Sequence, residues 1–205
     1  MPRRMCRGRG YDESIVNNNP NMSIRKTEIN GIVLIDQPIH QDARGYVIEM
    51  YKQNEFEQNV QSVKFVQDYE YQVAKNVVRG LHYQQPPYSQ SMIVRCVSGS
   101  IISLALDLRI GGKTYGKCLQ MELNDDNKLS EFIPQGFAHG FIALKDDTIV
   151  QYKCDNYFKG EATCGVNVFD SALNIAFPNE KNEAVISEMD LKWPLLKDVK
   201  SPFIA

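Results

Sequence analysis

Several features that would point to a particular partner or compartment are missing from this chain of 205 residues. Its formal net charge is only -2 and its pI is near 5.9, so no basic excess favours nucleic acid or an anionic membrane as a partner. No apolar run approaches the roughly 18 residues of a membrane span. No apolar segment follows the N-terminal arginines, which makes a secretory signal unexpected. The cysteine pattern described next leads us to expect a cytoplasmic protein.

Familiar metal, nucleophile and nucleotide motifs are missing as well. The five cysteines are odd in number and lack CxxC spacing, which is typical of reduced thiols. The three histidines, His40, His82 and His139, are far apart and lack the close spacing that is typical of metal ligands. The sequence contains no GxSxG, Walker or Rossmann glycine pattern. From these absences we expect that the protein uses no metal and no other cofactor.

The chain divides by composition into two parts. Residues 1–21 are rich in arginine and then in asparagine, and we expect them to be a disordered N-terminal extension. Residues 22–205 have the composition of one globular domain that is long enough to bury a substantial core.

Short apolar runs separated by glycine, proline and Asn/Asp turns dominate residues 22–205. They predict strands at 31–35, 46–51, 64–69, 92–97, 101–106, 117–123 and 148–153, and a short helix at 54–61. The runs 92–97 and 101–106 flank Ser98-Gly99-Ser100 and indicate a hairpin. This spacing favours an all-β sandwich or barrel, best matched by a cupin-type jelly roll of about eight strands with short peripheral helices.

The segment Val78–Gln84 combines an anion anchor with a proton acceptor. Arg79 offers paired donors that suit phosphate, and His82 can take and return a proton near neutral pH. The alternative is a strand with a surface arginine and a hydrogen-bonded histidine. Residues three apart on a regular strand face opposite sides, so a shared pocket requires a bend, for which Gly80 is the natural place.

A second proton carrier lies on the strand predicted at 148–153. Tyr152 alternates there with polar neighbours, and the pattern alone favours ordinary core packing for it. Its phenol is nevertheless the other candidate for acid–base chemistry.

Seven ordered motifs resemble those of the dTDP-4-dehydrorhamnose 3,5-epimerase family. The resemblance runs from about residue 24 to about residue 197 and rests on Asp42-x-Arg44-Gly45 with Glu49, Phe65-Val66-Gln67-Asp68, Arg79-Gly80-Leu81-His82-Tyr83-Gln84, Asp107-Leu108-Arg109, Thr114-Tyr115-Gly116-Lys117, Ile133-Pro134-x-Gly136-Phe137-Ala138-His139-Gly140-Phe141 and Tyr152-Lys153-Cys154.

The resemblance implies a metal-independent cupin that forms homodimers and acts on a nucleotide-diphosphate sugar with a 4-keto-6-deoxy ring. The keto group acidifies the hydrogens at C3 and C5, so a base can remove one, and reprotonation from the opposite face inverts that carbon. The family implies His82 as the base, Tyr152 as the acid and Asp190 as the carboxylate that orients the histidine. Without the family, Asp190 would be an ordinary surface acid.

The resemblance also implies a set of substrate-binding residues. Arg44 and Arg79 would hold the diphosphate, Glu49 and Gln67 would lie near the nucleotide, and His139 would line the sugar pocket. Arg44 and Glu49 would come from the partner subunit through an exchanged N-terminal strand. The alternatives are a solvated Arg44 and a hydrogen-bonded core histidine at 139.

The sequence departs from the family pattern near the expected site. Met92 stands where the family usually has a lysine that stabilises the developing enolate oxygen, and Tyr69, Phe158 and Met189 replace other polar residues. Three interpretations therefore stay open: an epimerase acting at both carbons, an epimerase acting at one carbon or on a different sugar nucleotide, and a non-catalytic cupin that binds a nucleotide sugar.

Overall fold

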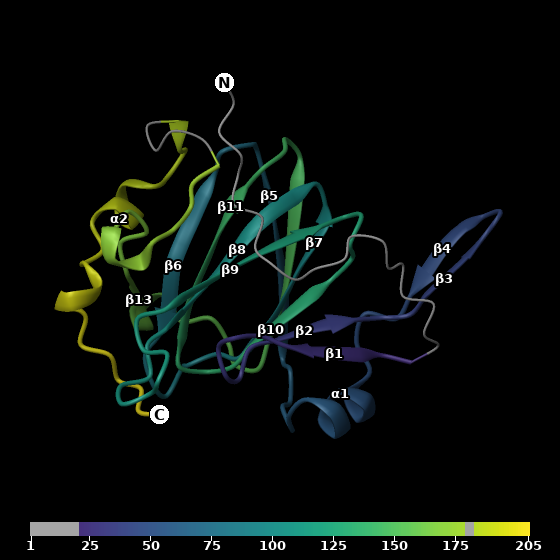
Figure 1. Ribbon diagram of the computed structural model, residues 1–205, viewed down its shortest axis with the longest axis horizontal. Helices are drawn as coiled ribbons and strands as arrows, with labels where there is room; N and C mark the ends of the chain where they lie inside the picture. Colours follow the sequence, from purple (N-terminus) through teal and green to yellow (C-terminus); the bar gives the residue numbers. More distant parts are fainter. Residues whose placement is uncertain (1–20, 179–182) are drawn as a thin grey trace.

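The computed structural model describes residues 21–178 and 183–205. Two β-sheets pack face to face in this part of the chain, which is the predicted all-β jelly roll of the cupin type (Figure 1). The extension predicted at residues 1–21 lies outside the described residues, apart from Asn21. None of the helices in the described ranges is long and apolar enough to cross a membrane.

The two sheets have different strand orders. The larger sheet has the order β1-β2-β10-β7-β12-β5 and comprises β1 (Ser23–Lys26), β2 (Val33–Asp36), β10 (Ser130–Ile133), β7 (Met92–Ser98), β12 (Thr148–Cys154) and β5 (Gln67–Val73). The smaller has the order β13-β6-β11-β8-β9 and comprises β13 (Thr163–Gly165), β6 (Val78–Gln84), β11 (Phe137–Ala143), β8 (Ser100–Asp107) and β9 (Cys118–Asn124).

Burial follows from how each sheet is covered. On β12 the inward Val150 and Tyr152 are buried while the residues between them are only half-buried, as the predicted alternation requires. Every residue of β11 is buried because both faces of the smaller sheet are covered. Its outer face packs against the C-terminal part of the chain, including Val168 and Leu173. This segment also contains the short helix α2 (Glu188–Leu191), which lies beside β6 (Figure 1).

The helix predicted at 54–61 is confirmed as α1 (Gln53–Asn59), whose Phe56 packs against Phe132 on the outer face of the larger sheet. Two strand boundaries were wrong. The strand predicted at 64–69 is β5, which begins at Gln67 and continues to Val73, and the strand predicted at 46–51 is β4 (Gly45–Ile48).

The predicted hairpin between residues 92–97 and 101–106 is wrong, although both of its strands exist. β7 pairs with β10 and β12, whereas β8 pairs with β9 and β11, so the turn between them crosses from one sheet to the other. Gly99 makes this crossing with a φ of +83°, and a Cβ there would lie 2.3 Å from the hydroxyl oxygen of Thr148. Turn residues therefore identified the reversal, while packing decided the strand partners.

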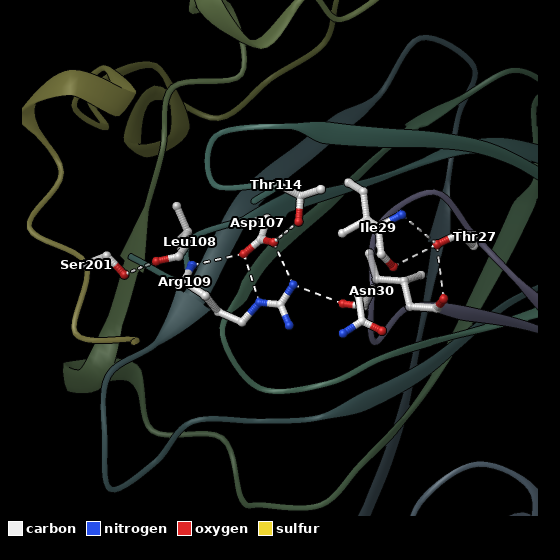
Figure 2. A network of polar contacts seen from close by, with 9 residues as sticks. Thr27, Ile29, Asn30, Asp107, Leu108, Arg109, Thr114 and Ser201 are labelled. Atoms are coloured by element: carbon white, nitrogen blue, oxygen red, sulfur yellow. Dashed lines mark hydrogen bonds and ion pairs between the residues drawn. The ribbon is translucent and has the colours of Figure 1, made fainter. Parts of the chain in front are cut away.

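A saturated polar network anchors the end of β8 (Figure 2). Asp107 is fully buried and accepts hydrogen bonds from Arg109 Nε at 2.9 Å, from Arg109 Nη2 at 2.6 Å and from Thr114 Oγ1 at 2.7 Å. Arg109 Nη2 also donates to the carbonyl of Asn30 at 2.9 Å, which ties the loop before β2 to the smaller sheet. Burial opposes ionisation of Asp107, but these donors outweigh it and hold its pKa below the ordinary value.

The remaining two strands form an arm. β3 (Ile39–Asp42) and β4 pair only with each other and project away from the two sheets (Figure 1). Tyr46 and Val47 on this arm are 52% and 60% exposed, which is unusual for large apolar side chains.

Candidate active site

A cavity of about 250 Å³ lies between the two sheets. His82 on β6 and His139 on β11 line it from the smaller sheet, and Tyr152 on β12 lines it from the larger one. The face-to-face packing therefore brings together the proton carriers that the sequence predicted, although they are far apart along the chain.

His82 is paired with a buried carboxylate. Its Nε2 lies 2.5 Å from Oδ1 of Asp190, which is 4% exposed. The hydroxyl oxygen of Ser187 caps α2 and accepts from the Asp190 N–H, while Trp193 Nε1 donates to Asp190 Oδ1 at 3.2 Å. Burial opposes ionisation of Asp190, but the hydrogen bonds from His82, Trp193 and the Gly80 N–H lower its pKa overall. The predicted contact between Asp190 and His82 is thus present.

The expected bend at Gly80 brings Arg79 and His82 to the same cavity. Gly80 has a φ of +104°, and a Cβ there would lie 2.6 Å from the Cα of Gly140 on the neighbouring strand. The register between β6 and β11 shifts at this point. The Arg79 guanidinium lies 4.1 Å from the centre of the Tyr71 ring, so stacking orients this cation at the cavity wall.

Tyr152 belongs to a cluster of aromatic rings. It is 4% exposed and stacks on Tyr69 with ring centres 4.8 Å apart, and it meets Tyr71 edge-on at 5.8 Å. Burial, reinforced by these two phenols, raises the pKa of Tyr152 well above its ordinary value. Tyr152 is consequently a protonated phenol at neutral pH, which is the state that an acid requires.

His139 is buried on the wall beside Tyr152, with ring centres 5.5 Å apart. Its Nε2 lies 3.0 Å from Oγ of Ser103 on β8. Burial, followed by the nearby His82, lowers the pKa of His139 to about 3. This imidazole is therefore neutral and can present a donor or an acceptor, but not a positive charge.

Three of the four departures from the family pattern line the cavity. They are Met92, Tyr69 and Phe158. Gln67 lines it too, and its Oε1 accepts from the Phe158 N–H at 2.7 Å. Met189 is instead 60% exposed on α2 and is not among the lining residues. The departures thus change the wall that a ligand would meet.

Two predicted substrate-binding residues lie away from this cavity. The Arg44 side chain is 90% exposed at the tip of the arm and pairs with Asp42 at 2.5 Å. Glu49 follows the arm and pairs with Lys52 at 2.5 Å. Within one chain neither side chain lines the cavity formed by His82, Arg79 and their neighbours.

Sequence reasoning missed several residues of the site. Trp193, the single tryptophan, orients Asp190, and Tyr71 orients Arg79, but no motif marks either of them. Ser103 and Glu131, which hydrogen-bond behind His139, were missed as well. No sequence pattern marked Glu131, because the strand that carries it, β10, was not among the predicted strands.

Across residues 21–178 and 183–205, no three His, Cys, Asp or Glu side chains are grouped so that they could hold a metal ion. The metal-independent chemistry that the resemblance implies stays a prediction.

Comparisons with known proteins agree with this architecture. The family model described as dTDP-4-dehydrorhamnose 3,5-epimerase matches residues 26–198. A dTDP-4-dehydrorhamnose 3,5-epimerase from Methanothermobacter thermautotrophicus is 38% identical over 174 residues, which cover 84% of this chain and 94% of the relative.

Two solved structures are also similar. A dTDP-6-deoxy-D-glucose-3,5-epimerase from Legionella pneumophila, in complex with dTDP-4-keto-L-rhamnose, is 31% identical with a TM-score of 0.86, covering 90% of this chain and 100% of that one. ChmJ, a 3'-monoepimerase from Streptomyces bikiniensis in complex with dTDP-quinovose, is 26% identical with a TM-score of 0.78, covering 83% and 86%. On the length of the family match and these identities, the chain belongs to the dTDP-4-dehydrorhamnose 3,5-epimerase family.

Proposed function

We propose that this protein is an isomerase that inverts C3 and C5 of a dTDP-linked 4-keto-6-deoxy sugar. The observation that carries the proposal is the placement of His82 and Tyr152, which line one cavity from opposite sheets, with Asp190 hydrogen-bonded to the histidine at 2.5 Å. A base on one face of a sugar ring and an acid on the other is the arrangement that inversion at a carbon requires.

The hydrogen bond to Asp190 assigns the two nitrogens of His82. With Nε2–H donating to the ionised Asp190, Nδ1 carries the lone pair that removes the proton next to the ketone. The electrons of the broken C–H bond form a C=C bond with the carbonyl carbon, and the carbonyl π electrons move onto oxygen to give an enolate. Asp190 stabilises the resulting imidazolium. The phenol of Tyr152 then delivers its proton to the opposite face of the carbon as the C=O bond re-forms, and exchange with solvent returns a proton to the phenolate and removes one from the imidazolium.

Substrate contacts come from both walls of the cavity and from a second copy of the chain. Arg79 offers its guanidinium to the diphosphate, Gln67 contacts the nucleotide, and His139 contacts the sugar. Arg44 and Glu49 would reach the cavity of a homodimer partner on the β3–β4 arm. Exposed Tyr46 and Val47 support this docking, because an isolated arm leaves both in water.

Incubation of the protein with a dTDP-4-keto-6-deoxy sugar in D₂O tests the proposal. We expect deuterium at C3 and at C5, lost in His82→Asn, with full exchange after exhaustive chelation of metals. Exchange that is abolished by chelation and restored only by an added metal would contradict the metal-independent mechanism. Binding of the nucleotide sugar with no deuterium at either carbon would overturn the enzyme proposal in favour of a non-catalytic binding protein.

A single-carbon epimerase is the second candidate. The observation that favours it is the changed cavity wall, where Met92, Tyr69 and Phe158 replace polar residues and one of them removes a cation. The similar ChmJ is a 3'-monoepimerase. Deuterium at one carbon only, with the other carbon unlabelled after prolonged incubation, would select this reading.

A further inference from the structure

A chain of hydrogen bonds leads from the cavity into the interior between the sheets. His139 Nε2 lies 3.0 Å from Ser103 Oγ, and Ser103 Oγ lies 2.5 Å from Oε2 of Glu131 on β10. The three residues are 6%, 1% and 0% exposed. The chain therefore links a cavity-lining imidazole to a carboxyl group that bulk water does not reach.

Glu131 lies in apolar surroundings. Its direct cross-strand neighbours are Leu34 on β2 and Val94 on β7, and both belong to the main core cluster. The titratable side chain linked to it is His139 on β11, which it reaches through Ser103 on β8. The Cys118 thiol on β9 packs against the other core cluster and is influenced by Glu131 electrostatically.

Within the described residues, Glu131 Oε1 has no hydrogen-bond partner. A buried carboxyl group with one hydrogen bond is costly to keep as a charge, so its presence calls for a role other than stability.

The two ends of the chain have opposite protonation behaviour. Burial raises the pKa of Glu131 to about 7, although the Ser103 hydroxyl favours the ionised form. Burial lowers the pKa of His139 to about 3, so the imidazole stays neutral. Near neutral pH, the group that gains or loses a proton in this chain is the glutamate and not the histidine.

Each state of the glutamate dictates a different direction for the hydrogen bonds. An ionised Glu131 accepts from the Ser103 hydroxyl, whose oxygen then accepts from Nε2–H of His139, and Nδ1 keeps a lone pair. A protonated Glu131 donates to Ser103 Oγ, the hydroxyl turns to donate to Nε2, and the ring proton is then on Nδ1. The imidazole carries one proton in both states, and only its position changes.

We propose that Glu131 is a positioning residue that selects, through Ser103, which ring nitrogen of His139 carries the proton. Protonated Glu131 makes His139 a donor towards the cavity, and ionised Glu131 makes it an acceptor. This step rests on the proposed function: the donor state supplies a hydrogen bond to the enolate oxygen in a cavity where Met92, on the opposite sheet, offers no charge.

The nitrogen chemical shifts of ¹⁵N-histidine report this selection directly and need no substrate. The chain has only three histidines, and a His40→Asn variant assigns one of them. We expect His139 to remain neutral from about pH 8.5 to about pH 5.5 while the protonated-nitrogen signal moves from Nε2 to Nδ1. In Glu131→Gln, whose amide does not titrate, one pattern should hold at every pH, whereas exposed Glu70→Gln should behave like the wild type.

An unchanged tautomer across this range in the wild type, or the same transition in Glu131→Gln, would overturn the proposal. Because the chemical-shift measurement uses the free protein, its outcome is independent of whether the protein is an epimerase. The pH dependence of deuterium exchange then tests the link to catalysis. Wild-type kcat should fall as the pH rises through about 7, and this fall should be lost in Glu131→Gln; a fall retained in the variant would refute the link.

Ser103→Ala removes the hydroxyl group that links His139 to Glu131 and leaves both of these residues in place. We expect the pH-dependent tautomer change to vanish and exchange to slow by about 10² at pH 6.5, the cost of one donor to an oxyanion. Ser103→Thr, which keeps a hydroxyl, should restore the tautomer change. Failure of the Thr variant to restore it while the melting temperature is normal would count against Ser103 as the connecting group.

Discussion

Two buried carboxyl groups in this protein have opposite surroundings. Asp107 and Glu131 are both fully buried. Asp107 accepts from the forked guanidinium of Arg109 and from Thr114, and its pKa is lowered (Figure 2). Glu131 accepts from Ser103 alone among the described residues, keeps one oxygen without a partner, and has its pKa raised to about 7.

The comparison shows that burial by itself does not decide the charge of an acid. The number of donors decides it, because each donor compensates part of the lost hydration. A saturated carboxylate such as Asp107 holds loops in place and stays ionised. A carboxyl group with few donors, such as Glu131, has a pKa near neutral pH and can therefore gain or lose a proton there. Such titration can serve a purpose beside a functional site.

The largest expected effect is the loss of deuterium exchange in a cavity variant, which distinguishes the cavity from the Asp107 network. His82→Asn should slow deuterium exchange by about 10² to 10⁴, because it removes the base while keeping a polar side chain of similar size. The melting temperature should fall less than in Asp107→Asn, since the His82 side chain is 38% exposed and Trp193 and the Gly80 N–H still donate to Asp190. Exchange within about tenfold of wild type would exclude His82 as the base.

Asp107→Asn should have the reverse effect, with loss of stability and no loss of exchange per folded molecule. Removing one partner of a buried ion pair typically costs about 3 to 5 kcal/mol, because the other charge stays buried. Urea denaturation measures it, with Asp126→Asn in an exposed turn as the matched control. The lowered pKa also means that the stability from Asp107 is present above the unfolded pKa of about 3.9 and is lost as the pH falls.

Glu131→Gln should change how the stability of the protein depends on pH, in contrast to Asp107→Asn. The raised pKa means that the native state holds a proton that the unfolded state has released, so Glu131 costs stability increasingly as the pH rises from about 4.5 to about 7. We expect Glu131→Gln to be more stable than the wild type by about 1 to 3 kcal/mol at pH 8.5, and equal to it below about pH 4. Equal urea midpoints at both pH values would show that Glu131 is not an uncompensated acid.

Met92→Lys should have the smallest effect. Met92 lines the cavity, and a lysine has a stem of similar length, so we expect the fold to remain and exchange to quicken by about tenfold. Val97→Lys on the same strand is the matched control, because Val97 is already 36% exposed. Met92 is 8% exposed and also belongs to the main core cluster, so a large drop in melting temperature without faster exchange would show that its side chain serves packing and not the cavity chemistry.

The sequence by itself determined the strand-rich fold and the family, and it singled out His82 and Tyr152 as candidate proton carriers. Alternation on β12 marked Tyr152 as inward, and the spacing of Arg79 and His82 required the bend at Gly80. These are local properties, because strand periodicity and backbone sterics depend on neighbouring residues.

Tertiary structure alone decided which groups meet. It placed β7 and β8 in different sheets, brought Trp193 to Asp190, and connected His139 to Glu131 through Ser103. It also placed Arg44 on the arm, away from the cavity of its own chain. None of these contacts has a sequence pattern of its own, because they join residues from separate strands, and their protonation follows from burial that exists only after the sheets have packed.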